Sequence, residues 1–488
     1  MMKSIKQSAV VVVGLLVTGC MVGPNYKEPQ TQVPATYNQP PATQPTTQST
    51  AAAAAATQPA MTGAWWTSFN DQTLNQLIIE ARQSNLDLRT AEARVREARA
   101  ARGIIAADYW PDIDAVGSYS RSRASKTIGN FGSFAAGEQD LFQAGFDAAW
   151  ELDVFGRVRR GVQGADADIQ AAIWDRNDVL LSLLGEVARN YVELRGFQRQ
   201  VAIAESNVKS QQETLDLTRV RLNAGLGTDL AVAQTEAQVA ATQSQIPAFQ
   251  NLAQQSIHRL SVLTGKPPAA LQAQLDPIQP VPAPPPDIPP GVPSELLRRR
   301  PDIRRAERQL AAATARVGVA TADLFPRFTL TGQLGVESNK FTNLGDGDST
   351  FWSIGPGVRF PIFNRGRLRS AVAVENARTE QALSQYEQTV LRSLEEVENA
   401  LVAYRKEFVR RESLARAVAS SQRSVSLSQQ LYQRGLTDFL NVLDAQRALY
   451  QNEDLLVQSE SNVSANAVAL FKALGGGWDV DQRVAARE

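Results

Sequence analysis

The side chains that most often carry chemistry are scarce in this chain of 488 residues. It has one cysteine, Cys20, and one histidine, His258, which excludes a disulfide framework, a zinc cluster and a Cys/His nucleophile pair with a spare member. No acid, base and nucleophile are grouped in a pattern typical of an active site. We therefore predict a protein that is not an enzyme and has no catalytic, cofactor-binding or metal site. A thioether copper relay also lacks support, because every methionine precedes the expected fold (Met1, Met2, Met21, Met61).

Cys20 follows a segment with the features of a signal peptide, residues 1–19. Lys3 and Lys6 are basic, and residues 9–17 are apolar but too few to span a bilayer, which takes about 20 residues. The sequence Val-Thr-Gly-Cys at 17–20 resembles the lipobox of bacterial lipoproteins, in which the cysteine is lipidated and becomes the first residue. Ordinary secretory cleavage beside a chance cysteine is the alternative. Met21 stands where lipoproteins of the inner membrane carry aspartate, so the resemblance implies sorting to the outer membrane.

Composition divides the rest of the chain. A net charge of zero gives no electrostatic signature for nucleic acid. Residues 20–63 are rich in Pro, Thr, Gln and Ala, which predicts a flexible or extended tether. Residues 267–293 form a second proline-rich segment, expected to be an extended connector, and residues 477–488 a C-terminal tail.

The connector separates two copies of one pattern, residues 64–266 and 294–476. Gly225 and Leu226 recur as Gly435 and Leu436, 210 positions later. Apolar residues of the first copy recur at the same spacing, at steps of four and three that are typical of coiled-coil packing (Leu180, Leu184, Val187, Tyr191 and Leu194). A period this long indicates a duplicated half-domain. We expect a long helical hairpin in each copy, at about 159–264 and 367–474, with each turn at the glycine.

Each copy also contains two segments of period two, at about 111–121 and 142–155 and at about 326–338 and 350–363. One face of each is apolar and the other polar or charged, with aromatic residues near the ends (Trp110, Phe142, Trp150, Trp352, Phe360). Such strands are typical of a membrane barrel with a water-filled lumen. Half-buried strands of a soluble sandwich, which show the same alternation of apolar and polar residues, are the alternative. Four strands cannot close a barrel, so other copies of the chain must supply the remaining strands. Two copies would give a filled eight-stranded barrel, and three would give twelve strands around a lumen. We favour the trimer.

These elements resemble those of the outer membrane efflux proteins, the TolC-like outer-membrane factors of tripartite pumps, in their lipoprotein branch. The most specific similarity is residues 291–332, GVPSELLRRRPDIRRAERQLAAATARVGVATADLFPRFTLTG; GPNY at 23–26, FGR at 155–157 and LDAQR at 443–447 also resemble the family. The resemblance implies an α+β membrane protein: a homotrimer with a 12-stranded outer-membrane barrel and a periplasmic α-barrel of helical hairpins. It also implies a passive exit duct for small molecules, opened by a periplasmic adaptor (membrane fusion) protein and an inner-membrane RND-type transporter.

The resemblance places the functional residues at the hairpin turns. Adaptor contact is expected at the tips (Gly225, Leu226, Thr228, Gly435, Leu436, Thr437) and the periplasmic gate on either side of the second turn (Asp444, Asn441, Tyr432, Arg434). Asn441 and Thr437 replace an acidic and a basic residue of the family's gate, so a salt-bridge lock is in doubt. The alternatives are that the tips are helix caps only and that Asp444 is a solvated helix residue. A protein-secretion duct of type I shares the fold, and a structural envelope-spanning lipoprotein would explain the lipid and the coiled coils.

Overall fold

A computed structural model describes residues 21–37, 63–123 and 138–478. The expected signal peptide and Cys20 lie outside the described residues, as does most of the expected tail. The chain divides into two compact units. The strand unit comprises Met1–Gln30, Arg94–Ala172 and Arg305–Tyr386, and the hairpin unit comprises Thr31–Ala93, Ile173–Arg304 and Glu387–Glu488.

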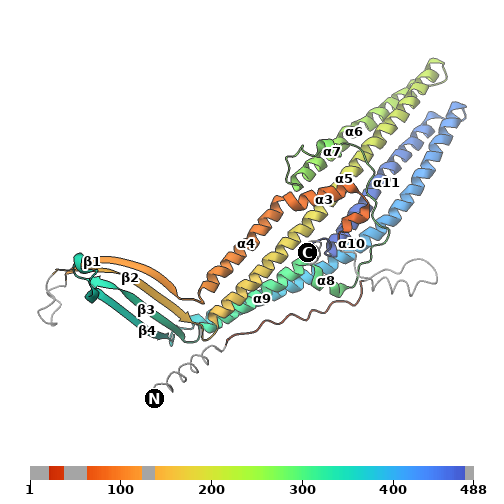
Figure 1. Ribbon diagram of the computed structural model, residues 1–488. Coiled ribbons are helices and arrows are strands. Elements are labelled where there is room, and N and C mark those ends of the chain that lie inside the picture. Colours follow the sequence, from red (N-terminus) through yellow and green to blue (C-terminus); the bar gives the residue numbers. More distant parts are fainter. Residues whose placement is uncertain (1–20, 38–62, 124–137, 479–488) are drawn as a thin grey trace. The chain divides into compact units, whose positions relative to one another are not determined.

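The strand unit contains one antiparallel sheet of four strands in the order β1-β2-β3-β4, visible in Figure 1. The strands are β1 (Asp112–Arg123), β2 (Glu138–Leu152), β3 (Arg327–Ser338) and β4 (Thr350–Arg359). Among the described residues neither β1 nor β4 has a second neighbouring strand, so the sheet has two open edges there. An open edge leaves a row of backbone donors and acceptors available for another strand.

The strand register places the alternating residues of the sequence on two different faces. Phe146 of β2 is opposite Leu334 of β3, which is opposite Trp352 of β4, and their side chains are 58%, 56% and 70% exposed. One residue further along β2, Asp147 is opposite Gln333. Because directly opposite residues share a face, the sheet has one apolar and one polar side. The apolar side is uncovered in the single chain, as a lipid-facing surface would be.

One pair of long helices follows the strands in each copy. The pairs are α5 (Arg157–Asn223) with α6 (Asp229–Leu263), and α10 (Arg367–Gln433) with α11 (Phe439–Ala473). Both α5 and α10 have 67 residues, about 100 Å at 1.5 Å per residue. The remaining helices of eight residues or more are α3 (Gln72–Ser84), α4 (Leu86–Ala107) and α9 (Pro301–Ala322). The shorter elements are α7 (Gln272–Leu275), α8 (Pro293–Arg299), η1 (Trp65–Phe69), η2 (Phe341–Asn343) and η3 (Gly347–Ser349).

The coiled-coil positions form the core of the hairpin unit. Leu184, Val187 and Tyr191 of α5 are completely buried, as are Val397 of α10 and Phe471 of α11. Burial of such a side chain stabilises the fold by about 1.5–3 kcal/mol relative to exposure. The heptad spacing thus predicted which face of α5 and of α10 packs. No helix among the described residues is both long and apolar enough to cross a membrane.

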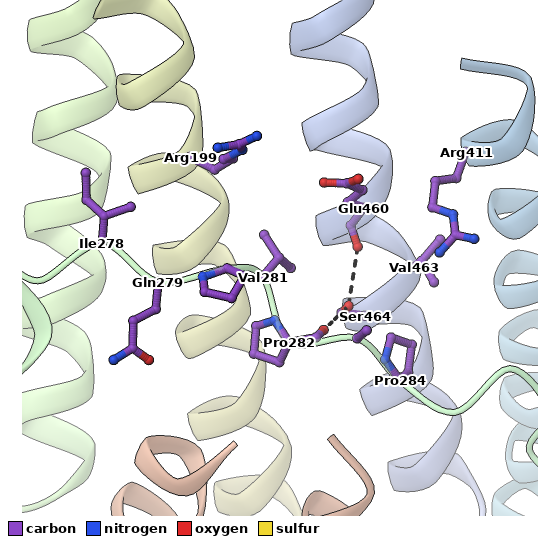
Figure 2. Close-up of a pocket in the computed structure, with 12 residues that line it drawn as sticks. Arg199, Ile278, Gln279, Val281, Pro282, Pro284, Arg411, Glu460, Val463 and Ser464 are labelled. Atoms are coloured by element: carbon purple, nitrogen blue, oxygen red, sulfur yellow. Dashed lines mark hydrogen bonds between the residues drawn. The ribbon is translucent and has the colours of Figure 1, made fainter. Parts of the chain in front are cut away.

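The proline-rich connector is fastened to the helices by hydrogen bonds to its carbonyl groups. Tyr404 of α10 donates to the carbonyl of Pro285 at 2.5 Å, and Ser464 of α11 donates to that of Pro282 at 2.6 Å. The connector lies beside a cavity of about 570 Å³. Figure 2 shows Arg199, Arg411 and Glu460 among the residues that line it. Since proline has no N–H, its carbonyl is the one backbone group that can anchor such a segment. This cavity lies where the connector packs against the helices.

Candidate functional site

The two hairpins turn at corresponding glycines with almost the same backbone. Gly225 and Gly435 have φ of 71° and 74°. The amides of Gly225 and Leu226 donate to the carbonyls of Leu222 and Arg221, at 2.9 and 2.8 Å. In the second hairpin Gly435 and Leu436 donate in the same pattern, to Tyr432 and Leu431, at 3.0 and 2.9 Å. This pair of bonds closes a helix with a residue in the left-handed region, which favours glycine.

The residues after the two turns are capped differently. The Thr228 hydroxyl accepts a hydrogen bond from the Ala231 amide at 3.3 Å and so caps α6. At the corresponding place Asp438 makes no side-chain cap on α11. Instead, the Asn441 amide donates to the Thr437 hydroxyl at 2.7 Å. Asn441 and Thr437, the two departures from the family's gate, are therefore hydrogen-bonded to each other in the second turn.

Leucines project from both turns into solvent. Leu226 and Leu436 are 68% and 69% exposed, and Leu230 and Leu440, one turn into the returning helices, are exposed too. Each pair is related by the 210-residue spacing of the repeat. Single exposed leucines are common on protein surfaces, but here the same two positions are exposed at both turns. We call these four residues the tip leucines.

Tyr432 lies in a small buried cluster at the ends of the hairpins. Its ring meets Phe439 edge-on at 5.5 Å between centroids, and Val442 and Leu443 complete the second hairpin's share of the cluster. Ala231, from α6 of the first hairpin, packs in the same cluster. The two hairpins are therefore in contact next to their turns, and Tyr432 is central to that contact.

Arg221, in the last turn of α5, reaches across to the second hairpin. Its guanidinium lies 4.5 Å from the centroid of the Tyr432 ring, and Nη1 donates to the Tyr432 carbonyl at 3.1 Å. That carbonyl is at the C-terminus of α10, where it also accepts from the Gly435 amide and where a cation is favoured. The Arg221 Nε is buried without a hydrogen-bond partner among the described residues. We call this arrangement the Arg221 clamp.

The other two expected gate residues, Asp444 and Arg434, are exposed. Neither side chain forms an ion pair or a hydrogen bond with another residue in the described part of the chain. Within one chain, therefore, Arg434 does not neutralise Asp444. The four expected gate residues fall into two groups: Tyr432 and Asn441 stabilise the turn region, and Asp444 and Arg434 face solvent.

Comparison with known proteins assigns this architecture to a family. The model of the family described as "Outer membrane efflux protein" matches residues 77–266 and 292–476. The chain belongs to the outer membrane efflux protein family. It is 36% identical over 420 residues to the pyoverdine export outer membrane protein OpmQ of Pseudomonas putida, covering 86% of this chain and 88% of OpmQ. It is 31% identical to the cation efflux system protein CusC of Escherichia coli, covering 96% and 97%.

The fold agrees with solved structures of the same family. The structure of the outer-membrane channel OprN superimposes with a TM-score of 0.86 at 38% identity, covering 94% of this chain and 100% of that one. As a member of the outer membrane efflux protein family, the chain is an outer-membrane efflux channel and not an enzyme. The α+β fold with two repeats, four strands and long helices is confirmed.

Polar contacts continue the junction between the two hairpins away from the turns. Gln446 of α11 donates to the buried Thr214 hydroxyl of α5 at 3.0 Å, and Arg447 donates to Gln238 of α6 at 2.9 Å. Further along α5, Gln200 donates to Asp454 at 2.6 Å. In each of these contacts at least one of the two side chains is uncharged, so none is an ion pair. The junction in this outer-membrane efflux channel is therefore held by hydrogen bonds, with Arg221 at its end.

Burial raises the pKa of several tyrosines of the hairpin unit, Tyr191 and Tyr450 among them. Burial raises the pKa of Tyr191 to about 12, and its hydroxyl donates to Asp71 at 2.8 Å. Burial likewise raises the pKa of Tyr450 to about 12. A buried phenolate costs more than a buried phenol because its charge loses hydration. Both groups are neutral at physiological pH, so they contribute to packing and not to the charge of the channel.

Proposed function

We propose that the chain forms a trimeric, passive exit duct whose barrel contains four strands from each copy. The two open sheet edges and the uncovered apolar face support this proposal. In lipid an unpaired strand edge costs several kcal/mol for each unsatisfied backbone group, so closure by neighbouring copies is strongly favoured. Three copies give twelve strands and leave room for a lumen lined by the polar face.

The gate of this duct is assigned to the ends of the hairpins, where the Arg221 clamp joins α5 to α10. The observation that carries this assignment is the position of the Arg221 guanidinium, 4.5 Å from the Tyr432 ring and bonded to the end of α10. The clamp holds two hairpins that no covalent bond joins at this end. Opening by separation of the hairpins would break the clamp, whereas it would leave each glycine turn intact. Asp444 then supplies one carboxylate per chain, three around the axis of a trimer, which favours cations at the entrance.

The tip leucines are proposed as the contact for a periplasmic adaptor protein, with an inner-membrane transporter of the RND type as the energy source. Their exposure and their repetition in both hairpins support this. Apolar side chains that protrude at the end of a rigid element are well placed to be buried by a partner, and their burial contributes about 25 cal/mol per Å². Thr228 and Thr437 lie beside them.

Cys20 is proposed as the site of lipidation that attaches the chain to the outer membrane. The lipobox-like sequence at 17–20 supports this, since Cys20 itself lies outside the described residues. A single acyl chain binds a membrane weakly and reversibly, so stable anchoring by lipid takes a second chain or another membrane-binding feature. Mass spectrometry of the mature N-terminus tests it: an unmodified cysteine would exclude Cys20 as the anchor.

The proposed function as a whole is tested in cells that lack their own outer-membrane efflux channel. The chain should lower the accumulation of a fluorescent efflux substrate when it is produced together with a periplasmic adaptor and an RND-type transporter. The same strain with the Leu226→Asp, Leu436→Asp double variant should accumulate the dye as the channel-free strain does. Unchanged accumulation with the wild-type chain, at normal levels in the outer membrane, would contradict the proposal.

A further inference from the structure

The segment directly after Cys20 is bound to the strand unit rather than projecting from it. The Val22 amide donates to the Phe155 carbonyl at 3.2 Å, just beyond the end of β2. Four residues later the Tyr26 hydroxyl donates to the buried carboxylate of Glu307 in α9, and the Arg308 guanidinium lies 5.5 Å from the Tyr26 ring. Tyr26 also packs on a small cluster of alanines (Ala167, Ala311, Ala312).

The centre of this attachment is Arg160, a fully buried cation near the start of α5. Its side chain is 1% exposed, and burial lowers its pKa. Nε donates to the Val22 carbonyl at 3.1 Å, and Nη2 donates to the Gly23 carbonyl at 3.2 Å and the Asn25 side chain at 2.7 Å. The fourth acceptor is Gln163, at 2.8 Å from Nη1.

No carboxylate pairs with Arg160 among the described residues, so oxygen dipoles alone compensate its buried charge. Three of the four acceptors belong to residues 22–25. A buried charge that loses its partners is strongly destabilising. Arg160 therefore depends on the N-terminal segment for the acceptors that compensate its charge, and the segment depends on Arg160 to hold it in place.

Two glycines allow the close approach. Gly23 has φ of 86°, and a Cβ on it would lie 2.5 Å from the Cα of Gly318 in α9. Gly318 in turn could not carry a side chain, because its Cβ would meet the Arg160 side chain at 2.7 Å. The fit between residues 23–26 and Arg160 therefore depends on glycine at both 23 and 318.

We propose that residues 21–26 form a strap, clamped by Arg160, that holds the processed N-terminus at the end of β2. This inference rests on the proposed lipidation of Cys20, the residue bonded to Met21. Acyl chains on that cysteine would then enter the membrane at a fixed place beside the sheet. They become part of the lipid-facing surface of the channel instead of a free tether.

The test is hydrogen–deuterium exchange with mass spectrometry on the full-length, detergent-solubilised protein, read for the peptide that contains Val22 to Tyr26. In the wild type we expect the Val22 amide to exchange at least about tenfold more slowly than in a free chain. Gly23→Ala should abolish that protection, and Asn25→Ala should reduce it about tenfold, as expected for one hydrogen bond to a charged group. Lys27→Ala, an exposed position just after the strap, should leave it unchanged.

Exchange at the free-chain rate in the wild type would overturn the strap. If Gly23→Ala prevents folding, Asn25→Ala still decides, because unaltered protection in that variant would show that Arg160 does not hold the segment. The mass of the same N-terminal peptide reports acylation separately. An unmodified Cys20 with a protected Val22 would refute the lipid anchor and leave the strap standing, and an acylated Cys20 with a rapidly exchanging Val22 would do the reverse.

Discussion

Arg221 and Tyr432 join the two helical hairpins at their far ends, with the guanidinium 4.5 Å from the ring centroid and Nη1 3.1 Å from the tyrosine carbonyl. The relationship breaks the symmetry of the repeat, because the position 210 residues after Arg221 is Leu431. One copy therefore supplies a cation, and the other supplies an aromatic ring and a helix end. The contact is specific to the junction between the copies.

The turn glycines give a prediction on stability, and a control glycine within a helix should show the opposite sign. Gly225→Ala and Gly435→Ala should each destabilise the protein by about 1 kcal/mol, because both have positive φ although the space around them is open. Gly103→Ala is the matched control: it also faces open space, but it lies within α4 and has no positive φ. That change should stabilise by about 0.5–1 kcal/mol. Thermal unfolding followed by circular dichroism measures all three, and a stabilising Gly225→Ala would refute the backbone argument.

The tip leucines give a prediction on partner binding. Leu226→Asp with Leu436→Asp should reduce adaptor binding at least about tenfold, since each side chain is more than two-thirds exposed and available for burial. The conservative pair Leu226→Met and Leu436→Met keeps an apolar surface and should bind almost as the wild type does. Surface plasmon resonance with the purified adaptor measures the affinity. Equal affinity of the aspartate and methionine pairs would place the contact elsewhere.

Alkaline pH should weaken the hairpin unit over a defined range. The pKa of Tyr191 is raised by burial from its usual value near 10 to about 12, so the folded state favours the neutral phenol. That stabilisation is complete below pH 10 and is lost as the pH rises through 12. In Tyr191→Phe the decrease in unfolding free energy between pH 10 and 12 should be shallower. Denaturant titrations at four pH values test this, and an identical slope in both proteins would contradict it.

Much of this architecture was predictable, because it repeats at short periods. The heptad positions of α5 and α10 and the alternation of β2 and β3 are local patterns that burial or lipid exposure imposes on every turn or pair of residues. The turn glycines were predictable for the same reason, since backbone geometry selects them at a helix end. The comparisons confirm the resulting family and function.

The Arg221 clamp and the Arg160 strap were missed, because each depends on one contact between segments far apart in the chain. The sequence around Arg221 resembles an ordinary charged, solvated helix face. Only the difference between Arg221 and Leu431, which occupies the corresponding position of the second copy, could have singled it out. The segment after Cys20 has too few apolar residues for a periodic signal, so its composition predicted a tether. Its seating depends instead on two glycines and a buried arginine, which composition does not reveal.

Asp444 gives a prediction on ion selectivity. The carboxylate is exposed and has no ion-pair partner in the described part of its own chain, so it can act on passing ions. In trimers reconstituted in planar bilayers under a KCl gradient, Asp444→Asn should lower the preference for cations by about half or more. Asp444→Glu keeps the charge and should behave as the wild type. Equal reversal potentials in all three proteins would make Asp444 an ordinary solvated residue.

The most direct test of the gate is single-channel recording of the isolated trimer with Arg221→Ala. Loss of a hydrogen bond from a charged group and of a cation–π contact should raise the open probability about tenfold or more. Arg219→Ala is the control, because Arg219 pairs with Glu236 inside the first hairpin, at 2.6 Å, and does not reach the second. We predict brief closed times for Arg221→Ala and wild-type gating for Arg219→Ala. An Arg221→Ala trimer that stays closed as the wild type does would contradict the assignment of the gate to the junction of the two hairpins.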